Sequence, residues 1–73
     1  MPRKVRELEA DLSREGFTRQ AGKGSHRRWV HPLYPSHGHV VMSGTASDDA
    51  KPYQEREVRQ AIDRVREAKK RQP

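Results

Sequence analysis

The apolar residues change their spacing twice along this chain, and this pattern limits the folds that it can adopt. Near the N-terminus, Val5, Leu8 and Leu12 recur at i, i+3 and i+7, which places them on one face of a helix. A second helical stripe near the C-terminus consists of Val58, Ala61, Ile62 and Val65. Between the stripes, short apolar runs alternate with glycine and proline, which is typical of strands and turns.

These patterns predict five elements. We expect helices over residues 2–15 and 53–69, with Gly16 just past the first helix, where glycine is common. Strands are expected over residues 17–21, 25–31 and 39–43. Gly22-Lys23-Gly24 is expected to join the first two strands as a hairpin turn. Short connections make the strands antiparallel, so the predicted fold is α+β, in the order α-β-β-β-α, with both helices on one face of a three-stranded sheet.

A chain of 73 residues is expected to form one domain, here residues 1–73 with a short basic tail from about 67. The chain contains no cysteine, which excludes disulfides and thiolate zinc sites. No apolar run is long enough to span a membrane, so we expect a cytoplasmic protein without a membrane partner. Its net charge of +6 attracts nucleic acid, anionic lipid or an acidic protein.

Residues 22–31 combine a turn, cations and histidines, which points to chemistry on RNA. Imidazole exchanges protons near neutral pH, so His26 is a candidate general base or acid. RNA carries its own nucleophile, the 2′-hydroxyl group, and its cleavage requires mainly a proton acceptor and cations for the developing charge. Lys23, Arg27 and Arg28 are the neighbouring cations. From these residues alone, an exposed histidine without a function is the alternative.

Strand alternation indicates which of these side chains meet a ligand. In a core this poor in aromatic residues, Trp29 is expected to point inward. His26, Arg28 and Val30 then point toward the open face of the sheet.

Metal chemistry finds little support in the sequence. His31, His37 and His39 have neither a cysteine nor a nearby carboxylate to complete a tetrahedral zinc site, and we interpret them as turn and strand-end residues. Asp48 and Asp49 fit a turn or a helix N-cap better than a divalent ion site. We therefore expect no metal and no other cofactor.

The motif Gly24-Ser25-His26, followed by Trp29 and His31-Pro32, resembles the HicA family of small toxins. The layout is similar as well, with a basic first helix, Glu15-Gly16-Phe17 leading into the first strand, and a final amphipathic helix. The resemblance covers about residues 3–66 and departs from the family pattern over residues 42–54.

This resemblance implies a fold like that of double-stranded-RNA-binding domains. It also implies metal-independent cleavage of mRNA, as in the mRNA interferases of type II toxin–antitoxin systems, and a HicB-type antitoxin as the partner protein. His26 corresponds to the catalytic histidine of the family. We expect Lys23, Gly24, Ser25, Arg27 and Arg28 to bind the RNA. A non-catalytic RNA-binding module and a basic interaction protein are the alternatives.

Overall fold

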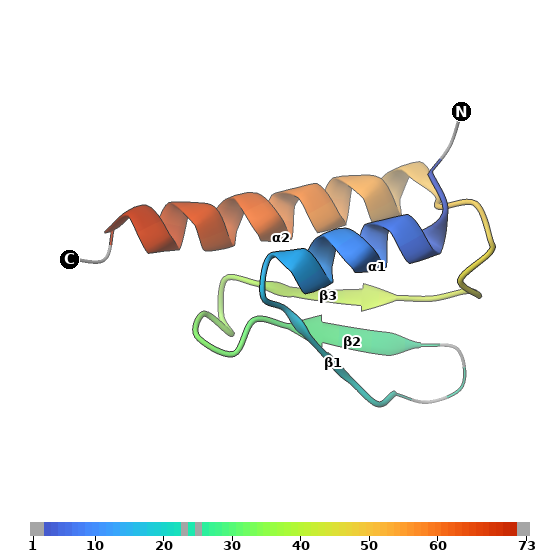
Figure 1. Cartoon of the computed structure of the whole chain (residues 1–73), viewed down its shortest axis with the longest axis horizontal. Coiled ribbons are helices and arrows are strands. Elements are labelled where there is room, and N and C mark those ends of the chain that lie inside the picture. Colours follow the sequence, from blue (N-terminus) through green and yellow to red (C-terminus); the bar gives the residue numbers. More distant parts are fainter. Residues whose placement is uncertain (1–2, 23, 25, 72–73) are drawn as a thin grey trace.

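The computed structural model describes residues 3–22, 24 and 26–71, and it confirms the predicted order of elements. These are α1 (Val5–Arg14), β1 (Thr18–Gln20), β2 (Arg27–Val30), β3 (His39–Met42) and α2 (Pro52–Arg71). The strands form one antiparallel sheet in the order β1-β2-β3, and Figure 1 shows both helices on the same side of it. Each strand is shorter than predicted. The connection from β1 to β2 contains two glycines, which have little preference for strands.

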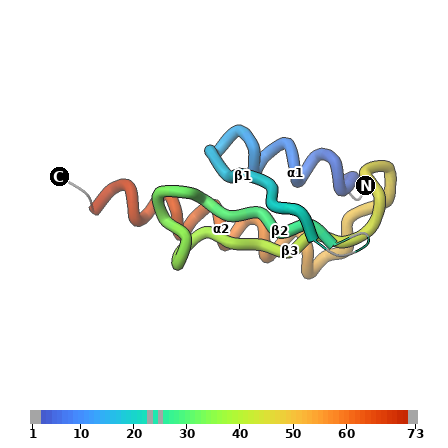
Figure 2. The backbone as a smooth tube through the Cα atoms, turned by 90° about the horizontal axis from the view of Figure 1, so that it is seen from below, coloured from blue at the N-terminus to red at the C-terminus, as the bar shows by residue number. Residues whose placement is uncertain are grey.

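The register of the sheet sorts its side chains onto two faces. Trp29 pairs with Val40, and both are buried beneath the helices. Arg28 pairs with Val41, and both are exposed on the opposite face. Figure 2 shows this open face, where the strands pass in front of α2. The prediction that Trp29 points inward and Arg28 outward is therefore confirmed.

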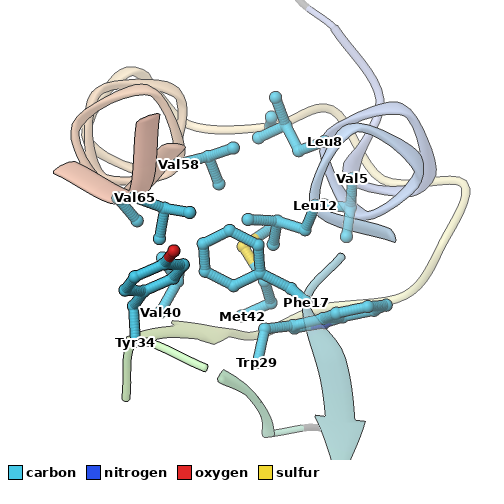
Figure 3. Packing of buried hydrophobic residues seen from close by; sticks show 12 residues of the cluster. Val5, Leu8, Leu12, Phe17, Trp29, Tyr34, Val40, Met42, Val58 and Val65 are labelled. Carbon is cyan, nitrogen blue, oxygen red and sulfur yellow. The ribbon is translucent and has the colours of Figure 1, made fainter. Parts of the chain in front are cut away.

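A single apolar cluster fills the space between the helices and the sheet (Figure 3). Leu12 of α1, Met42 of β3 and Val65 of α2 meet in it with no exposed surface. Phe17 follows the end of α1 and turns back into the cluster. The remaining members are Val5, Leu8, Trp29, Tyr34, Val40, Ala50, Val58 and Ala61.

The polar segment between β3 and α2 caps the first helix. The backbone N–H groups of Val5 and Arg6 donate to the carbonyl oxygens of Asp48 and Ala46, at 2.9 and 3.0 Å. Glu7 Oε1 accepts from the backbone N–H of Lys4 at 2.8 Å. These bonds satisfy donors that the first turn of a helix leaves free, and they attach α1 to the loop before α2.

The second helix is longer than predicted and includes the basic residues Lys69, Lys70 and Arg71. Cations in the last turn of a helix interact favourably with its dipole, and lysine and arginine are good helix formers. At the other end, Pro52 occupies the first helical position, and Gln54 Oε1 accepts from the backbone N–H of Lys51 at 2.9 Å. Within the described residues, no helix is long and apolar enough to cross a membrane.

Acid is expected to destabilise the fold partly through Asp11. A hydrogen bond from Arg3 at 2.7 Å lowers the pKa of Asp11 below its ordinary value of 3.8. A carboxyl group whose pKa is lower in the folded state stabilises the fold above its unfolded pKa, and this stabilisation disappears as the pH falls through the folded value. We expect Asp11→Asn to lose less unfolding free energy between about pH 4 and pH 2 than the wild type. Urea denaturation across this range tests the prediction, and equal slopes would contradict it.

Candidate functional site

Two glycines shape the connection between β1 and β2. A Cβ atom at position 22 would overlap the backbone carbonyl oxygen of His26, so only glycine fits there without a shift. Gly24 has a φ of +59°, in the left-handed region that favours glycine, as the predicted turn requires. Lys23 and Ser25, which the sequence predicts as RNA-binding residues, lie outside the described residues.

The close approach at Gly22 leads to a test by substitution. We expect Gly22→Ala to lower the unfolding free energy by about 2–3 kcal/mol, because backbone must move to admit the methyl group. Gly24→Ala is the matched control: its Cβ meets nothing within 4 Å, and only the left-handed backbone costs about 1 kcal/mol. Chemical denaturation of both variants measures the difference. A smaller loss for Gly22→Ala than for Gly24→Ala would contradict the packing argument.

His26 directly precedes β2, and its side chain is exposed. Among the described residues, no hydrogen bond or ion pair engages its imidazole. Figure 1 shows the start of β2 at the end of the molecule where both helices begin. The imidazole is therefore accessible to a ligand that approaches this end.

Arg27 lies on the helix-covered face of β2, where Glu9 of α1 binds its guanidinium group. Arg27 Nε donates to Glu9 Oε2 at 2.8 Å and Nη2 donates to Oε1 at 3.2 Å, while Nη1 donates to the carbonyl oxygen of Gly44 at 3.0 Å. Trp29 Nε1 donates to the same Glu9 oxygen at 2.8 Å. The side chains of Arg27 and Glu9 are only 17% and 13% exposed. This carboxylate therefore ties the beginning of β2, next to His26, to α1.

The two arginines that the sequence predicts as RNA contacts thus have different surroundings. Arg28 is exposed and forms no ion pair with any described residue, so its charge is available to an anion. The charge of Arg27 is balanced by Glu9, and its side chain points away from the open face. These contacts indicate that Arg27 attaches β2 to α1. They give no geometric support to the RNA contact that the sequence predicts for it.

The charges of the sequence are divided between the two layers of the fold. All ten acidic residues lie outside residues 16–47, the segment that forms the three strands. This segment contains all four histidines and the cations Arg19, Lys23, Arg27 and Arg28. The helices contain acidic and basic residues in mixed order. The strand segment therefore contributes most of the net positive charge of the chain, although Glu9 of α1 balances Arg27.

His31 follows β2, as expected of a residue at a strand end, and it is also buried in the core. The residue is 3% exposed, and its ring lies edge-on to Phe17, with ring centroids 5.4 Å apart. Tyr34 packs against the same ring at 5.1 Å, and His31 Nδ1 accepts from the backbone N–H of Leu33 at 3.2 Å. No local signal in the sequence marks this histidine as buried, because its partners come from other segments.

The two aspartates hold the loop before α2. Asp48 Oδ2 accepts from the backbone N–H of Thr45 at 2.9 Å, and this bond lowers the pKa of Asp48. Asp49 Oδ1 accepts from Lys4 Nζ at 2.6 Å. Asp48 therefore stabilises the turn that the sequence predicts here, whereas Asp49 forms an isolated bridge with Lys4. Within the part of the chain that the structure describes, no three histidine, aspartate or glutamate side chains group as potential metal ligands.

A cavity of about 500 Å³ lies between α1 and α2, apart from the predicted site residues. Leu8, Val58 and Ile62 contribute its apolar lining, and its other walls carry both signs of charge. Ion pairs such as that between Arg66 and Glu15 balance several of these charges. The cavity therefore lies along the packing interface of the two helices. No histidine lines it, so it differs from the surroundings of His26.

Comparison with known proteins places this arrangement in a family. A family model described as the HicA toxin of bacterial toxin-antitoxin matches residues 5–63, which include α1, all three strands and the first part of α2. No curated protein and no solved structure matches the chain. The resemblance seen in the Gly24-Ser25-His26 motif is thus confirmed for the family.

Proposed function

The chain belongs to the family of HicA toxins of bacterial toxin–antitoxin systems, and we propose that it is an endoribonuclease that cleaves mRNA without a metal ion. In this proposal His26 is the general base and the general acid. The reaction needs no cofactor, because RNA supplies the nucleophile and the protein supplies the proton transfers.

In the proposed reaction, the His26 side chain carries one proton from the attacking hydroxyl group to the leaving oxygen. The His26 imidazole takes the proton of a 2′-hydroxyl group, whose oxygen attacks the adjacent phosphorus. The bond between phosphorus and the 5′-oxygen then breaks, and the imidazolium returns the proton to that leaving oxygen. The products are a 2′,3′-cyclic phosphate and a 5′-hydroxyl group, so the atoms balance without water.

Cations stabilise the negative charge that develops on the phosphorane oxygens. Arg28 is exposed, unpaired among the described residues and two positions from His26, which supports this role. We propose Lys23 and the Gly24-Ser25 segment, which precede His26 in sequence, as the other phosphate contacts.

One observation carries the proposal most directly. An exposed histidine with no structural partner among the described residues stands beside β2, in a segment of the chain that has no acidic residue. His31 shows the contrast, because its ring is buried, stacked and hydrogen-bonded. His26 is exposed and has no such contact with any residue that the structure describes, which leaves it free to act on a substrate.

The same proposal names the partners and the location. A net charge of +6, concentrated in the strand segment, favours mRNA as the substrate and an acidic protein as the inhibitor. Membership of a toxin–antitoxin family makes a HicB-type antitoxin the proposed inhibitor, and both act in the cytoplasm in this proposal.

The experiment is a cleavage assay without metal. We expect the purified chain to cleave a transcribed mRNA in excess EDTA, with fragments resolved by gel electrophoresis. A DNA strand of the same sequence lacks the 2′-hydroxyl groups and should stay intact. If the RNA is bound but not cleaved, the chain is an RNA-binding module instead. The logarithm of its affinity should then fall with the logarithm of the salt concentration, with a slope of roughly 0.7 for each phosphate that it contacts.

A further inference from the structure

The two edges of the sheet differ in how well they are protected. β1 is three residues long, and its middle residue is the cationic Arg19. Charged side chains on short edge strands are a common protection against pairing with other chains. β3 contains His-Val-Val-Met, with no aspartate, glutamate, lysine or arginine from residue 29 to residue 47. Of the two edges, β3 therefore offers the better template for another strand.

Hydrogen-bond alternation shows which groups of β3 face outward. The backbone N–H of His31 donates to the carbonyl oxygen of Gly38 at 2.9 Å, which places these opposite residues at a hydrogen-bonded position of the ladder, while the Gly38 N–H donates to the carbonyl oxygen of Tyr34. In an antiparallel ladder such pairs alternate, so Val40 and Met42 also bond to β2. The N–H and C=O groups of His39 and Val41 therefore point away from β2, outward from the edge of the sheet. Among the described residues, the backbone bonds outside the ladder engage neither of these two residues.

The surface beside this edge is apolar and cationic. Val41 is 49% exposed on the open face, where its cross-strand neighbour is Arg28. The side chains of an added strand would contact the side chain of Val41. Its backbone would form hydrogen bonds with the outward N–H and C=O groups of His39 and Val41. Strand addition of this kind obtains affinity from main-chain hydrogen bonds and specificity from alternate side chains.

We propose that the free edge of β3 binds an extended segment of the antitoxin, which adds to the sheet as a fourth strand. The proposal rests on the proposed toxin function. The charge of the chain favours an acidic antitoxin segment over a second copy of the chain. Two copies with a net charge of +6 repel each other. An acidic segment, in contrast, is attracted to a strand segment that has no acidic residue of its own. A strand bound there is separated from Arg28 by Val41 of β3, so its side chains on the open face would border the surface proposed for RNA.

The test uses a proline at the position whose N–H faces outward. Val41→Pro removes that donor without removing a bond of the β2–β3 ladder, and proline is tolerated on edge strands. We expect its affinity for the purified antitoxin encoded with this toxin to fall at least 100-fold. Val41→Thr keeps the donor and the branched shape and should bind within about threefold of the wild type. Equal affinities of the proline variant and the wild type would overturn the proposal.

A second measurement does not depend on any variant. Hydrogen exchange of the wild-type chain should show the His39 and Val41 amides becoming protected when the antitoxin binds, while the Arg19 amide on the other edge stays unchanged. Unchanged exchange at β3, no binding of the antitoxin, or self-association that Val41→Pro abolishes would each overturn strand addition. RNA cleavage is measured separately, so a chain that fails to cleave RNA but shows this protection refutes the proposed function alone.

Discussion

Replacement of His26 by alanine is expected to reduce RNA cleavage by about 100- to 10,000-fold, the range typical of a lost general acid–base group. The side chain is exposed and has no partner among the described residues, so its removal should leave the fold intact. We therefore expect unchanged thermal unfolding and nearly unchanged RNA affinity. The measurement is the single-turnover cleavage rate of a defined mRNA fragment in EDTA.

His39→Ala is the matched control for this prediction. His39 is also an exposed histidine of the strand segment, but it lies on the edge strand β3 and not beside the β1–β2 turn. We expect its cleavage rate to stay within about threefold of the wild-type rate, well below the effect of a lost acid–base group. A His26→Ala variant that cleaves as fast as His39→Ala would remove His26 from the mechanism.

The largest loss of stability is expected for Glu9→Ala. The substitution leaves the mostly buried guanidinium of Arg27 without its carboxylate and the indole N–H of Trp29 without its acceptor. Removal of one partner from a buried ion pair typically costs about 3–5 kcal/mol. Because these side chains keep some exposure, we expect a loss of about 3 kcal/mol, a large share of what a domain of this size has.

Two further variants separate this effect from a general loss of charge. Glu67→Ala removes an exposed partner of Arg71 and should change the unfolding free energy by less than about 0.5 kcal/mol. Glu9→Gln keeps an acceptor for Trp29 and should lose less than Glu9→Ala. Urea denaturation measures all three. Equal losses for Glu9→Ala and Glu67→Ala would contradict the role of Glu9 as the tie between α1 and β2.

Local patterns predicted the architecture because periodic burial dictates it. The stripe of Val5, Leu8 and Leu12 predicted one buried helix face, and all three residues are buried. Alternation along β2 predicted that Trp29 points inward while Arg28 points outward, and the register confirms this. These predictions succeed because each depends only on residues within one element.

The contacts around the candidate site were not predictable in the same way. Glu9 and Arg27 are separated by 18 positions, and neither the helix pattern nor the strand pattern identifies one as the partner of the other. The sequence predicted Arg27 as an RNA contact, whereas its ion pair with Glu9 depends on how α1 packs over β2. The burial of His31 likewise depends on Phe17 and Tyr34, which surround its ring only after folding.

The polar segment between β3 and α2 has a structural role in this fold. Its residues Ala46 and Asp48 accept hydrogen bonds from the first turn of α1, and Asp49 pairs with Lys4. The predicted strand over residues 39–43 and the predicted helix from residue 53 leave this segment between them, and its proline, serine and aspartate residues disfavour helix and strand. Its attachment to α1 required the tertiary structure, because free helix donors can be satisfied by any nearby carbonyl group.

The chemical identity of the product ends tests the central claim most directly. If His26 activates the 2′-hydroxyl group of RNA, wild-type protein in EDTA leaves a 2′,3′-cyclic phosphate on one fragment and a 5′-hydroxyl group on the other. Mass spectrometry of the fragments distinguishes these ends from their alternatives. Fragments that carry a 5′-phosphate and a 3′-hydroxyl group, or an RNA that stays intact, would contradict the account.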